Sequence, residues 1–221
     1  SRYPGAQILG HRDAVETDKT CPNFDVESWW TARCHETETD RLVVTAPTLA
    51  MTVSPDSLLL ETELLFGETM QVLERTRSHA RVVLATDGYE GWVRSDMTGA
   101  SGVTATHRVT APATHVLADP DVKSVPLMKL SMGACLSVCG TGDGWHEVRL
   151  PDGGSGWITG QAASPLGTTA SDFVSIAERF IGAPYLWGGR SSAGLDCSAL
   201  VQLALQAVGI ECPRNSGDQY E

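Results

Sequence analysis

The sequence feature that most constrains the fold is a weak internal repeat within residues 57–163, where short apolar runs alternate with Gly, Asp and Pro. Each copy ends in an Asp-Gly pair followed by a Gly-Trp-apolar step, at residues 87–93 in the first copy and 152–158 in the second. An Asp-Gly pair between apolar runs is a strong hairpin signal, because both central positions of the turn tolerate a positive φ. The region is therefore expected to form two copies of one small β-rich unit.

The repeated pattern resembles the bacterial SH3-like barrel. The resemblance implies two barrels in tandem, at residues 57–105 and 106–166, with a targeting or site-shaping role beside a wall-lytic catalytic domain. Trp92 and Trp157 are expected to close the two small cores, because buried Trp dominates the packing of small barrels. Ligand contact by these two side chains is the alternative. Contacts with a ligand are expected instead from a variable loop such as residues 119–124.

From Ser171 onward the apolar periodicity becomes helical. Ser171 and Asp172 form a helix start, and apolar residues then recur at helical spacing over residues 173–180. After a Gly-rich turn, a second helix is expected to begin around Cys197 and to stop at Gly209.

Cys197 falls in the first turn of that second helix. Unpaired backbone N–H groups and the positive end of the helix dipole favour a thiolate over a thiol there. A thiolate is the nucleophile that acyl transfer needs, and the same amides suit a developing oxyanion. A buried, chemically inert Cys at a helix start is the alternative that position alone leaves open.

The residues around Cys197 resemble the NlpC-type family of papain-like cell-wall cysteine peptidases. The motifs are Pro-Tyr-x-Trp-Gly-Gly at 184–189, Asp-Cys-Ser at 196–198 and Pro-Arg-x-Ser-x-x-Gln at 213–219. The resemblance covers residues 171–221. It implies hydrolysis of the bond between γ-D-glutamate and the diamino acid of peptidoglycan stem peptides, with Cys197 as the nucleophile.

The same resemblance implies roles for the neighbouring residues. Asp196 and Ser198 would contact the N-terminal part of the substrate, and Tyr185 would lie beside the oxyanion. Trp187 is expected to pack in the core under the helix. The expected fold is mainly β with α+β ends: two small SH3-like barrels followed by the N-terminal helical half of a papain-like α+β domain at residues 167–221.

The sequence departs from the family pattern in two places. Ala199 stands where the family has Gly, which preserves helix propensity. More seriously, the catalytic His of the family lies well downstream of the Cys, and none of the six His of this sequence matches that position. A Cys without its base lacks the partner on which this chemistry depends. We therefore expect the chain as given to be a fragment of a longer enzyme and to be inactive as a peptidase.

Residues 1–35 resemble the closing motif of zinc-dependent N-acetylmuramoyl-L-alanine amidases of the phage-lysozyme type. The resemblance rests on Gly-His-Arg-Asp and Asp-Lys-Thr-Cys-Pro, both within residues 10–22. It implies that His11 and Cys21 ligate zinc and that Lys19 assists catalysis. Imidazole and thiolate suit tetrahedral zinc, but a catalytic site needs one more protein ligand and a water. The expected site is therefore incomplete, and a surface His with an ordinary Cys is the alternative.

Charge and composition limit the kinds of binding partner that this chain can have. A net charge of −11 argues against nucleic acid and against capture by anionic wall polymers. Apolar runs are far shorter than the ~18 residues of a membrane helix. The six Cys are irregularly spaced and predict no disulfide framework. Residues 36–56 mix charge with Thr and Pro and are expected to be a linker.

Three functions remain open from the sequence. The first is a peptidoglycan endopeptidase acting on stem peptides, without a cofactor. The second is a wall-binding module in which only the SH3-like barrels act, and the third is the targeting part of a zinc amidase. The resemblances imply a place in the bacterial cell envelope or periplasm, or a phage-encoded lysis product.

Overall fold

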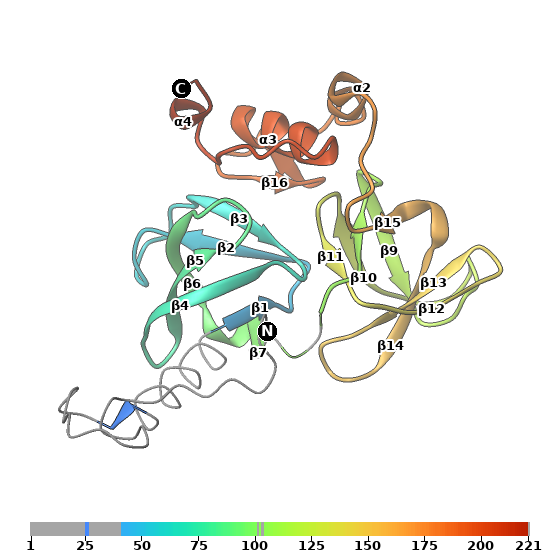
Figure 1. Ribbon diagram of the computed structural model, residues 1–221, viewed down its shortest axis with the longest axis horizontal. Helices are drawn as coiled ribbons and strands as arrows, with labels where there is room; N and C mark the ends of the chain where they lie inside the picture. Colours follow the sequence, from blue (N-terminus) through green and yellow to red (C-terminus); the bar gives the residue numbers. More distant parts are fainter. Residues whose placement is uncertain (1–24, 27–40, 101, 103, 221) are drawn as a thin grey trace, which may run out of the picture. The chain divides into compact units, whose positions relative to one another are not determined.

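The structure, a computed structural model, describes residues 25–26, 41–100, 102 and 104–220. Contacts divide the chain into two units, residues 1–41 and residues 42–221. The second unit holds two barrels that lie side by side, with a helical C-terminal segment across one end of both (Figure 1).

The first barrel is a sheet of seven strands in the order β3-β2-β6-β5-β4-β1-β7. The strands are β1 (Arg41–Val44), β2 (Thr48–Thr52), β3 (Thr62–Leu65), β4 (Thr69–Arg75), β5 (His79–Leu84), β6 (Glu90–Arg94) and β7 (Thr98–Ala100), with the 3-10 helix η2 (Ser95–Met97) before β7. Strands β1 and β2 lie in residues 36–56, so the expectation of a linker there is wrong. The buried residues of both strands alternate along the chain, as in a half-buried sheet, and the charged residues before β1 mask that pattern.

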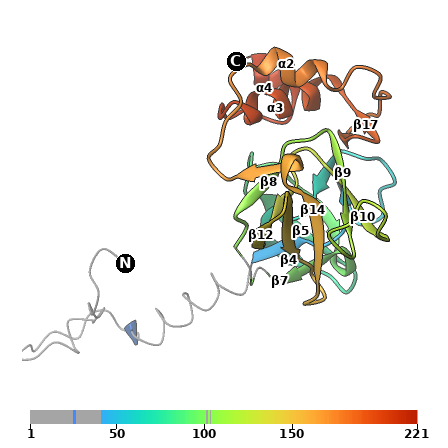
Figure 2. The same cartoon turned by 90° about the vertical axis from the view of Figure 1, so that its right-hand side faces the viewer.

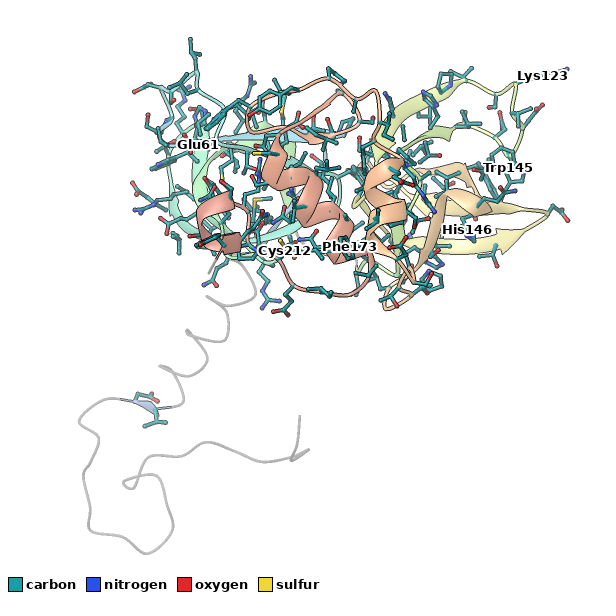
Figure 3. The ribbon with its side chains drawn as sticks, turned by 90° about the horizontal axis from the view of Figure 1, so that it is seen from above. Glu61, Lys123, Trp145, His146, Phe173 and Cys212 are labelled. Carbon is teal, nitrogen blue, oxygen red and sulfur yellow. The ribbon has the colours of Figure 1, made fainter. Side chains whose placement is uncertain are left out.

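The second barrel combines a five-stranded and a three-stranded sheet, in the orders β10-β9-β14-β13-β12 and β11-β8-β15. Its elements are β8 (His107–Val109), β9 (Ala113–Leu117), β10 (Pro126–Ser131), β11 (Cys135–Leu136), β12 (Val138–Gly142), β13 (Trp145–Arg149), β14 (Ser155–Thr159), η3 (Gly160–Ala162) and β15 (Ala163–Pro165). Figure 3 shows Trp145 and His146 of β13 on this barrel.

The structure confirms the predicted repeat. Both barrels end in a strand, a 3-10 turn and a short strand, β6-η2-β7 in the first and β14-η3-β15 in the second. The two Asp-Gly turns have positive φ at Gly88 (73°) and Gly153 (88°), as the hairpin signal requires.

The two repeat tryptophans do not close the cores, and that expectation is wrong. Trp92 and Trp157 are half-buried and lie outside the core clusters of the described residues. Their neighbours Val93 and Ile158 fill the cores instead. Successive side chains of a strand point to opposite faces, so a buried Val93 places Trp92 on the outer face.

The C-terminal segment carries α2 (Phe173–Glu178), the two-stranded hairpin β16 (Arg190–Ser191) and β17 (Gly194–Leu195), α3 (Cys197–Ala207) and α4 (Ser216–Tyr220) (Figure 2). Asp172 caps α2, since its carboxylate accepts hydrogen bonds from the backbone N–H groups of Val174 and Ser175. The predicted helix start is therefore confirmed. Phe173 differs from the expected apolar face, because it is 48% exposed (Figure 3).

Three consecutive side chains at the end of β3 bind the unit together. Leu64 lies in the core of the first barrel, Phe66 in that of the second, and Leu65 in a third core under the helices. This third core is shared by both barrels and the helical segment; its buried members are Leu65, Met132, Ile176, Phe180, Leu195, Ala199, Leu203 and Ala204. The helical segment thus packs on both barrels rather than forming a separate core.

In the part of the chain that the structure describes, no helix combines the length and the apolar character that a membrane span requires. Four of the six cysteines fall in this part, Cys135, Cys139, Cys197 and Cys212, and all four are free thiols.

Candidate active site

Cys197 is the first residue of α3 and is exposed. The residue before it, Asp196, is the N-cap, and its carboxylate accepts a 2.8 Å hydrogen bond from the backbone N–H of Ala199. The hairpin of β16 and β17 ends at Leu195, directly before this cap. The predicted position of Cys197 at a helix start is confirmed.

The carboxylate of Asp196 is the centre of a buried hydrogen-bond network. Besides Ala199, it accepts bonds from the backbone N–H of Gly188 (3.0 Å), the hydroxyl of Ser198 (3.2 Å) and both terminal nitrogens of Arg214 (3.0 and 2.7 Å). Burial alone would raise the pKa of Asp196. The hydrogen bonds from Arg214 and Ala199 outweigh that effect and lower the pKa below its usual range. Asp196 is therefore held as a carboxylate beneath the Cys197 turn.

Ser198 belongs to the same network. Its hydroxyl accepts a 2.8 Å bond from Arg214 Nη1, and its backbone carbonyl accepts a 3.0 Å bond from Gln219 Nε2. Asp196 and Ser198 flank Cys197 in the chain, and both side chains are buried. Their bonds fix the backbone around the nucleophile. Direct contact of either side chain with a substrate stays a prediction.

Two aromatic residues of the preceding turn face outward. Tyr185 is 66% exposed and pairs with Leu195 in an isolated bridge, so its ring is free to line a site. Trp187 is 71% exposed, and the expectation that it packs in the core is wrong. The Gly-rich turn holds its backbone against the first barrel and leaves the indole on the surface.

Arg190, of the hairpin before Cys197, is fully buried against the first barrel. Its guanidinium makes two 3.1 Å bonds to the carboxylate of Glu68, and Nη1 also reaches the carbonyl of Glu63 at 3.0 Å. Its backbone N–H donates to Glu63 Oε2, while Glu68 Oε2 accepts from the N–H of Leu65. Burial would lower the pKa of Arg190, but the charge of Glu68 raises it. Both carboxylate oxygens of Glu68 are therefore hydrogen-bonded in this ion pair.

Two further bonds tie the helical segment to the first barrel. Arg214 Nε donates a 2.7 Å bond to the hydroxyl of Thr62 on β3. The buried Gln202 of α3 donates to Asp87 Oδ2 in the β5-β6 turn (2.8 Å) and to the carbonyl of Cys212 (3.1 Å). Figure 3 shows Cys212 beside these helices.

The loop before β3 packs against the Gly-rich turn. Gly188 has φ of 73°, and a Cβ there would lie 2.8 Å from Leu60 Cγ, so only Gly fits. Glu61 lies on this loop (Figure 3), and the hydroxyl of Tyr89 donates to its carboxylate at 3.4 Å. Burial, and next the charge of Glu61, raise the pKa of Tyr89, while a hydrogen bond with Asn215 opposes the shift. The first barrel therefore contributes polar groups beside the site, which the sequence motifs do not reveal.

The described histidines are His79, His107, His115 and His146. In the described part of the chain, none of them forms a hydrogen bond with Cys197. The rings of His107 and His146 lie 5.2 Å apart on the second barrel, and burial, followed by the charge of His146, lowers the pKa of His107. These histidines belong to the barrels, so the described site holds a nucleophile and helix amides but no bonded imidazole base.

The zinc site expected at His11 and Cys21, with Lys19 nearby, lies outside the described residues. Within residues 25–26, 41–100, 102 and 104–220, no group of three or more His, Cys, Asp or Glu could hold a metal ion. The zinc site therefore stays a prediction.

Comparisons with known proteins agree with this geometry. Residues 182–221 match the NlpC/P60 family, and residues 52–97 match the bacterial dipeptidyl-peptidase SH3 domain. A γ-D-glutamyl-L-lysine dipeptidyl-peptidase of Bacillus subtilis is 27% identical over 73% of this chain and 57% of its own length. A γ-DL-glutamyl hydrolase of the same species is 46% identical over 27% of this chain and 14% of its own length. The chain spans a little over half the length of the first of these relatives.

A solved structure of an NlpC/P60 family protein from Bacillus cereus has the same fold. It superposes with a TM-score of 0.71 at 21% identity, covering 81% of this chain and 76% of the other. Fold, motif and cap geometry thus converge on one assignment. The chain combines a segment that matches the bacterial dipeptidyl-peptidase SH3 domain with a C-terminal segment that matches the NlpC/P60 family.

Proposed function

We propose that this chain is part of a peptidoglycan hydrolase, a cysteine peptidase that cuts the bond between γ-D-glutamate and the diamino acid of stem peptides. The observation that carries the proposal is the exposed Cys197 at the start of α3, fixed by the buried Asp196 cap within an NlpC/P60 segment. The names of the relatives support the substrate class.

The helix start supplies the nucleophile and the oxyanion donors of acyl transfer, while no described histidine is bonded to Cys197 as its base. Attack of Cys197 Sγ on the γ-carbonyl carbon forms a C–S bond and an oxyanion. The Ala199 N–H is taken by Asp196, so the N–H groups of Cys197 and Ser198 are the ones that can face the oxyanion. Collapse of the tetrahedral intermediate breaks the C–N bond, and the proton lost by the Cys197 thiol passes to the leaving amine of the diamino acid. Water then hydrolyses the thioester.

The first barrel offers a place for the N-terminal end of the substrate. A dipeptidyl-peptidase must recognise a free amine, and a carboxylate is the side chain that pairs with an ammonium group. Glu61 stands beside the Gly-rich turn, with Tyr89 hydrogen-bonded to it. We assign Glu61 and Tyr89 to that end of the site, with the exposed Tyr185 on its other side.

The test is hydrolysis of L-Ala-γ-D-Glu-L-Lys by the protein of the complete reading frame. Mass spectrometry should show release of lysine, and Cys197→Ala should abolish it. The matched control is Cys139→Ala, since Cys139 is the other exposed thiol among the described residues. The zinc amidase alternative needs a muropeptide as a second substrate, because the tripeptide lacks the bond between the muramoyl group and L-alanine. Release of an intact stem peptide from a muropeptide by Cys197→Ala, stopped by a chelator, would favour that alternative.

We further propose that residues 1–221 alone do not turn over substrate, because none of the described histidines is bonded to Cys197. Alkylation by iodoacetamide, mapped by mass spectrometry, separates this from misfolding, since in the folded chain the exposed Cys197 should react and the buried Cys212 should be protected. Turnover by residues 1–221 at the rate of the complete protein would contradict the proposal.

A further inference from the structure

A pocket that the peptidase chemistry does not use lies where the second barrel meets the helical segment. Its volume is about 510 Å³, within the range of small-molecule sites. Its walls come from β8, from the connection at residues 166–170 that leads from β15 to α2 (Figure 1), from α2 and from the C-terminal half of α3. Cys197 does not line it. We call it the β8–α2 pocket.

The charge of the β8–α2 pocket is positive. Among the described residues that line it, Arg108 and Arg179 carry the only charges, and none is Asp, Glu or His. In the part of the chain that the structure describes, neither arginine forms an ion pair. Two cationic side chains without an acidic partner are unexpected in a chain with a net charge of −11. They mark this pocket as a local site for an anion.

Arg108 lies in the middle of this wall. On β8 it is in register with Cys135 of β11 on one side and Ser164 of β15 on the other. Burial raises the pKa of the Cys135 thiol, and the nearby charge of Arg108 opposes that shift. Glu68 also acts on Cys135, but both of its carboxylate oxygens are already bonded to Arg190. Arg108 therefore faces a neutral thiol and a hydroxyl, neither of which balances its charge.

The Nε atom of Arg108 is a buried donor without a hydrogen-bond partner among the described residues. Buried polar groups are nearly always hydrogen-bonded, so an unpartnered guanidinium N–H beside a pocket indicates a ligand, an ion or a water that completes it. A guanidinium has five N–H donors and no acceptor, so the missing partner must be an acceptor.

Arg179 brings a second guanidinium to the same wall. Its Nη1 donates a 3.5 Å hydrogen bond to the carbonyl of Thr110, two residues after Arg108. Two residues of an extended chain span about 7 Å. The side chain of Arg179 is exposed, and its other N–H groups have no partner in the described part of the chain. Both guanidinium groups are thus placed to bind one small ligand.

Hydroxyl groups complete the set of donors. Those that line the pocket belong to Thr110, Ser164, Thr168 and Thr169. None of these hydroxyls has a hydrogen-bond partner within the described residues. The C-terminal end of α3 would repel an anion, but the carbonyl of Ala207 already accepts a 2.8 Å bond from the N–H of Ala170. The opposite wall is apolar and consists of Met132, Ile176 and Leu203 of the third core.

We infer that the β8–α2 pocket binds a small organic dianion. The negative oxygens of the ligand accept hydrogen bonds from Arg108 and Arg179, and its short apolar part lies on the third core. Two negative charges balance the two guanidinium groups, and planar guanidinium suits both carboxylate and phosphate oxygens. Dicarboxylates and phosphate monoesters share this chemistry. The inference does not rest on the proposed function.

A ligand in this pocket bridges the second barrel and the helical segment. It contacts β8, the connection and both helices, so the complete site exists only while α2 and α3 are docked on the barrel. A ligand that binds only the folded state stabilises that state by mass action. Leu203 lies six residues after Cys197, about 9 Å along the axis of α3. The ligand therefore secures the helix that carries the nucleophile without touching the nucleophile.

The experiment measures binding of glutarate and of propyl phosphate to the complete protein by calorimetry. Glutaramide, in which amides replace both carboxylates, is the neutral control and should not bind. Binding of the dianions should weaken as salt is added, because ions screen the attraction between charges. The dianion that binds more tightly identifies the acidic group of the ligand as carboxylate or phosphate.

Substitution of each arginine tests its role. Arg108→Gln and Arg179→Gln should each weaken binding of the tighter probe about tenfold or more, since each removes charge-assisted hydrogen bonds. The matched control is Arg149→Gln, which removes the same charge from an exposed position of the second barrel outside this pocket. That control should change the affinity less than about twofold.

Thermal melting separates a binding role of Arg108 from a structural one. Because its Nε has no partner in the folded protein, Arg108→Gln should leave the Tm of the ligand-free protein unchanged or raise it. The rise in Tm that saturating probe causes in the wild-type protein should disappear in this variant. A lower ligand-free Tm together with an unchanged rise on adding probe would assign Arg108 to the fold and contradict the inference.

Absence of binding by both dianions, or equal binding of glutarate and glutaramide, would overturn the inference. So would equal losses of affinity in Arg179→Gln and Arg149→Gln. Neither probe contains a peptide bond, so binding is measured apart from catalysis. A protein that binds the dianion but does not cut L-Ala-γ-D-Glu-L-Lys would refute only the proposed function, and one that cuts the tripeptide but binds neither dianion would refute only this inference.

Discussion

The two barrels arise from one repeated sequence pattern but contact the catalytic segment through different chemistry. The first barrel holds it through buried charges, with Arg190 on Glu68 and Arg214 on Thr62. The second barrel contributes Met132 to the shared core and a hydroxyl contact from Ser131 to Ser192. Similar folds thus serve different ends: one barrel shapes the site, and the other supports it.

Substitution of Glu68 tests most directly whether the first barrel holds the catalytic segment through buried charges. Glu68→Ala leaves the buried guanidinium of Arg190 without its partner, and the loss should be about 3–5 kcal/mol of unfolding free energy. Urea denaturation followed by circular dichroism measures it. Replacing both residues, Glu68→Leu with Arg190→Met, should recover much of that loss, because no uncompensated charge remains. A cost for Glu68→Ala no greater than that for Ser131→Ala would contradict the difference between the barrels.

A second prediction concerns pH and Asp196. Its folded pKa is depressed, so the stability it contributes is present above its unfolded pKa of about 3.9 and is lost as pH falls through the lower folded value. Asp196→Asn should cost about 2 kcal/mol at neutral pH, because Arg214 loses a charged acceptor. The variant should also show a shallower loss of stability below that unfolded pKa. Parallel pH curves for both proteins would refute this assignment.

The hydrogen bond from Arg214 to Thr62 tests the same difference between the barrels, with a smaller expected loss of unfolding free energy. Thr62→Val keeps the shape of the side chain but removes the acceptor for Arg214 Nε, with an expected cost of about 1.5 kcal/mol. Urea denaturation measures this cost. Hydrolysis of the tripeptide L-Ala-γ-D-Glu-L-Lys should also show a reduced kcat/KM, since Arg214 holds the Asp196 cap. Unchanged stability together with unchanged kcat/KM would show that this contact is dispensable.

The smallest effect is expected on the second barrel. Ser131→Ala removes the hydroxyl that accepts a 3.1 Å bond from the backbone N–H of Ser192. The expected cost is about 1 kcal/mol, typical of one neutral hydrogen bond. Peptide hydrolysis should stay near the wild-type rate. A tenfold loss of kcat/KM would mean that the second barrel also shapes the site.

The sequence predicts well what depends on neighbours along the chain. The Asp-Gly hairpins, the helix start at residues 171–172 and the helix start at Cys197 follow from local rules, and all three are present, with Asp172 as the cap of the first helix. The outward position of Trp92 could also have been predicted from the sequence, because successive side chains of β6 point to opposite faces and Val93 lies in the core.

What the sequence could not supply are partners far apart in the chain. Glu68 and Arg190 are separated by 122 positions, and no local pattern links a turn of the first barrel with a hairpin before the nucleophile. The pairing of Glu61 with Tyr89 depends likewise on the sheet bringing β6 next to the loop before β3. The exposure of Trp187 depends on how the turn packs on the barrel, so composition alone suggested burial.

The identity of the nucleophile is the central claim, and trapping the acyl-enzyme tests it most directly. The complete protein, mixed with L-Ala-γ-D-Glu-L-Lys and quenched in acid, should gain the mass of an alanyl-glutamyl group. Peptide mapping should place that mass on the fragment containing Cys197, and the Cys139→Ala protein should behave in the same way. An adduct on another residue, or one that persists in Cys197→Ala, would contradict the account.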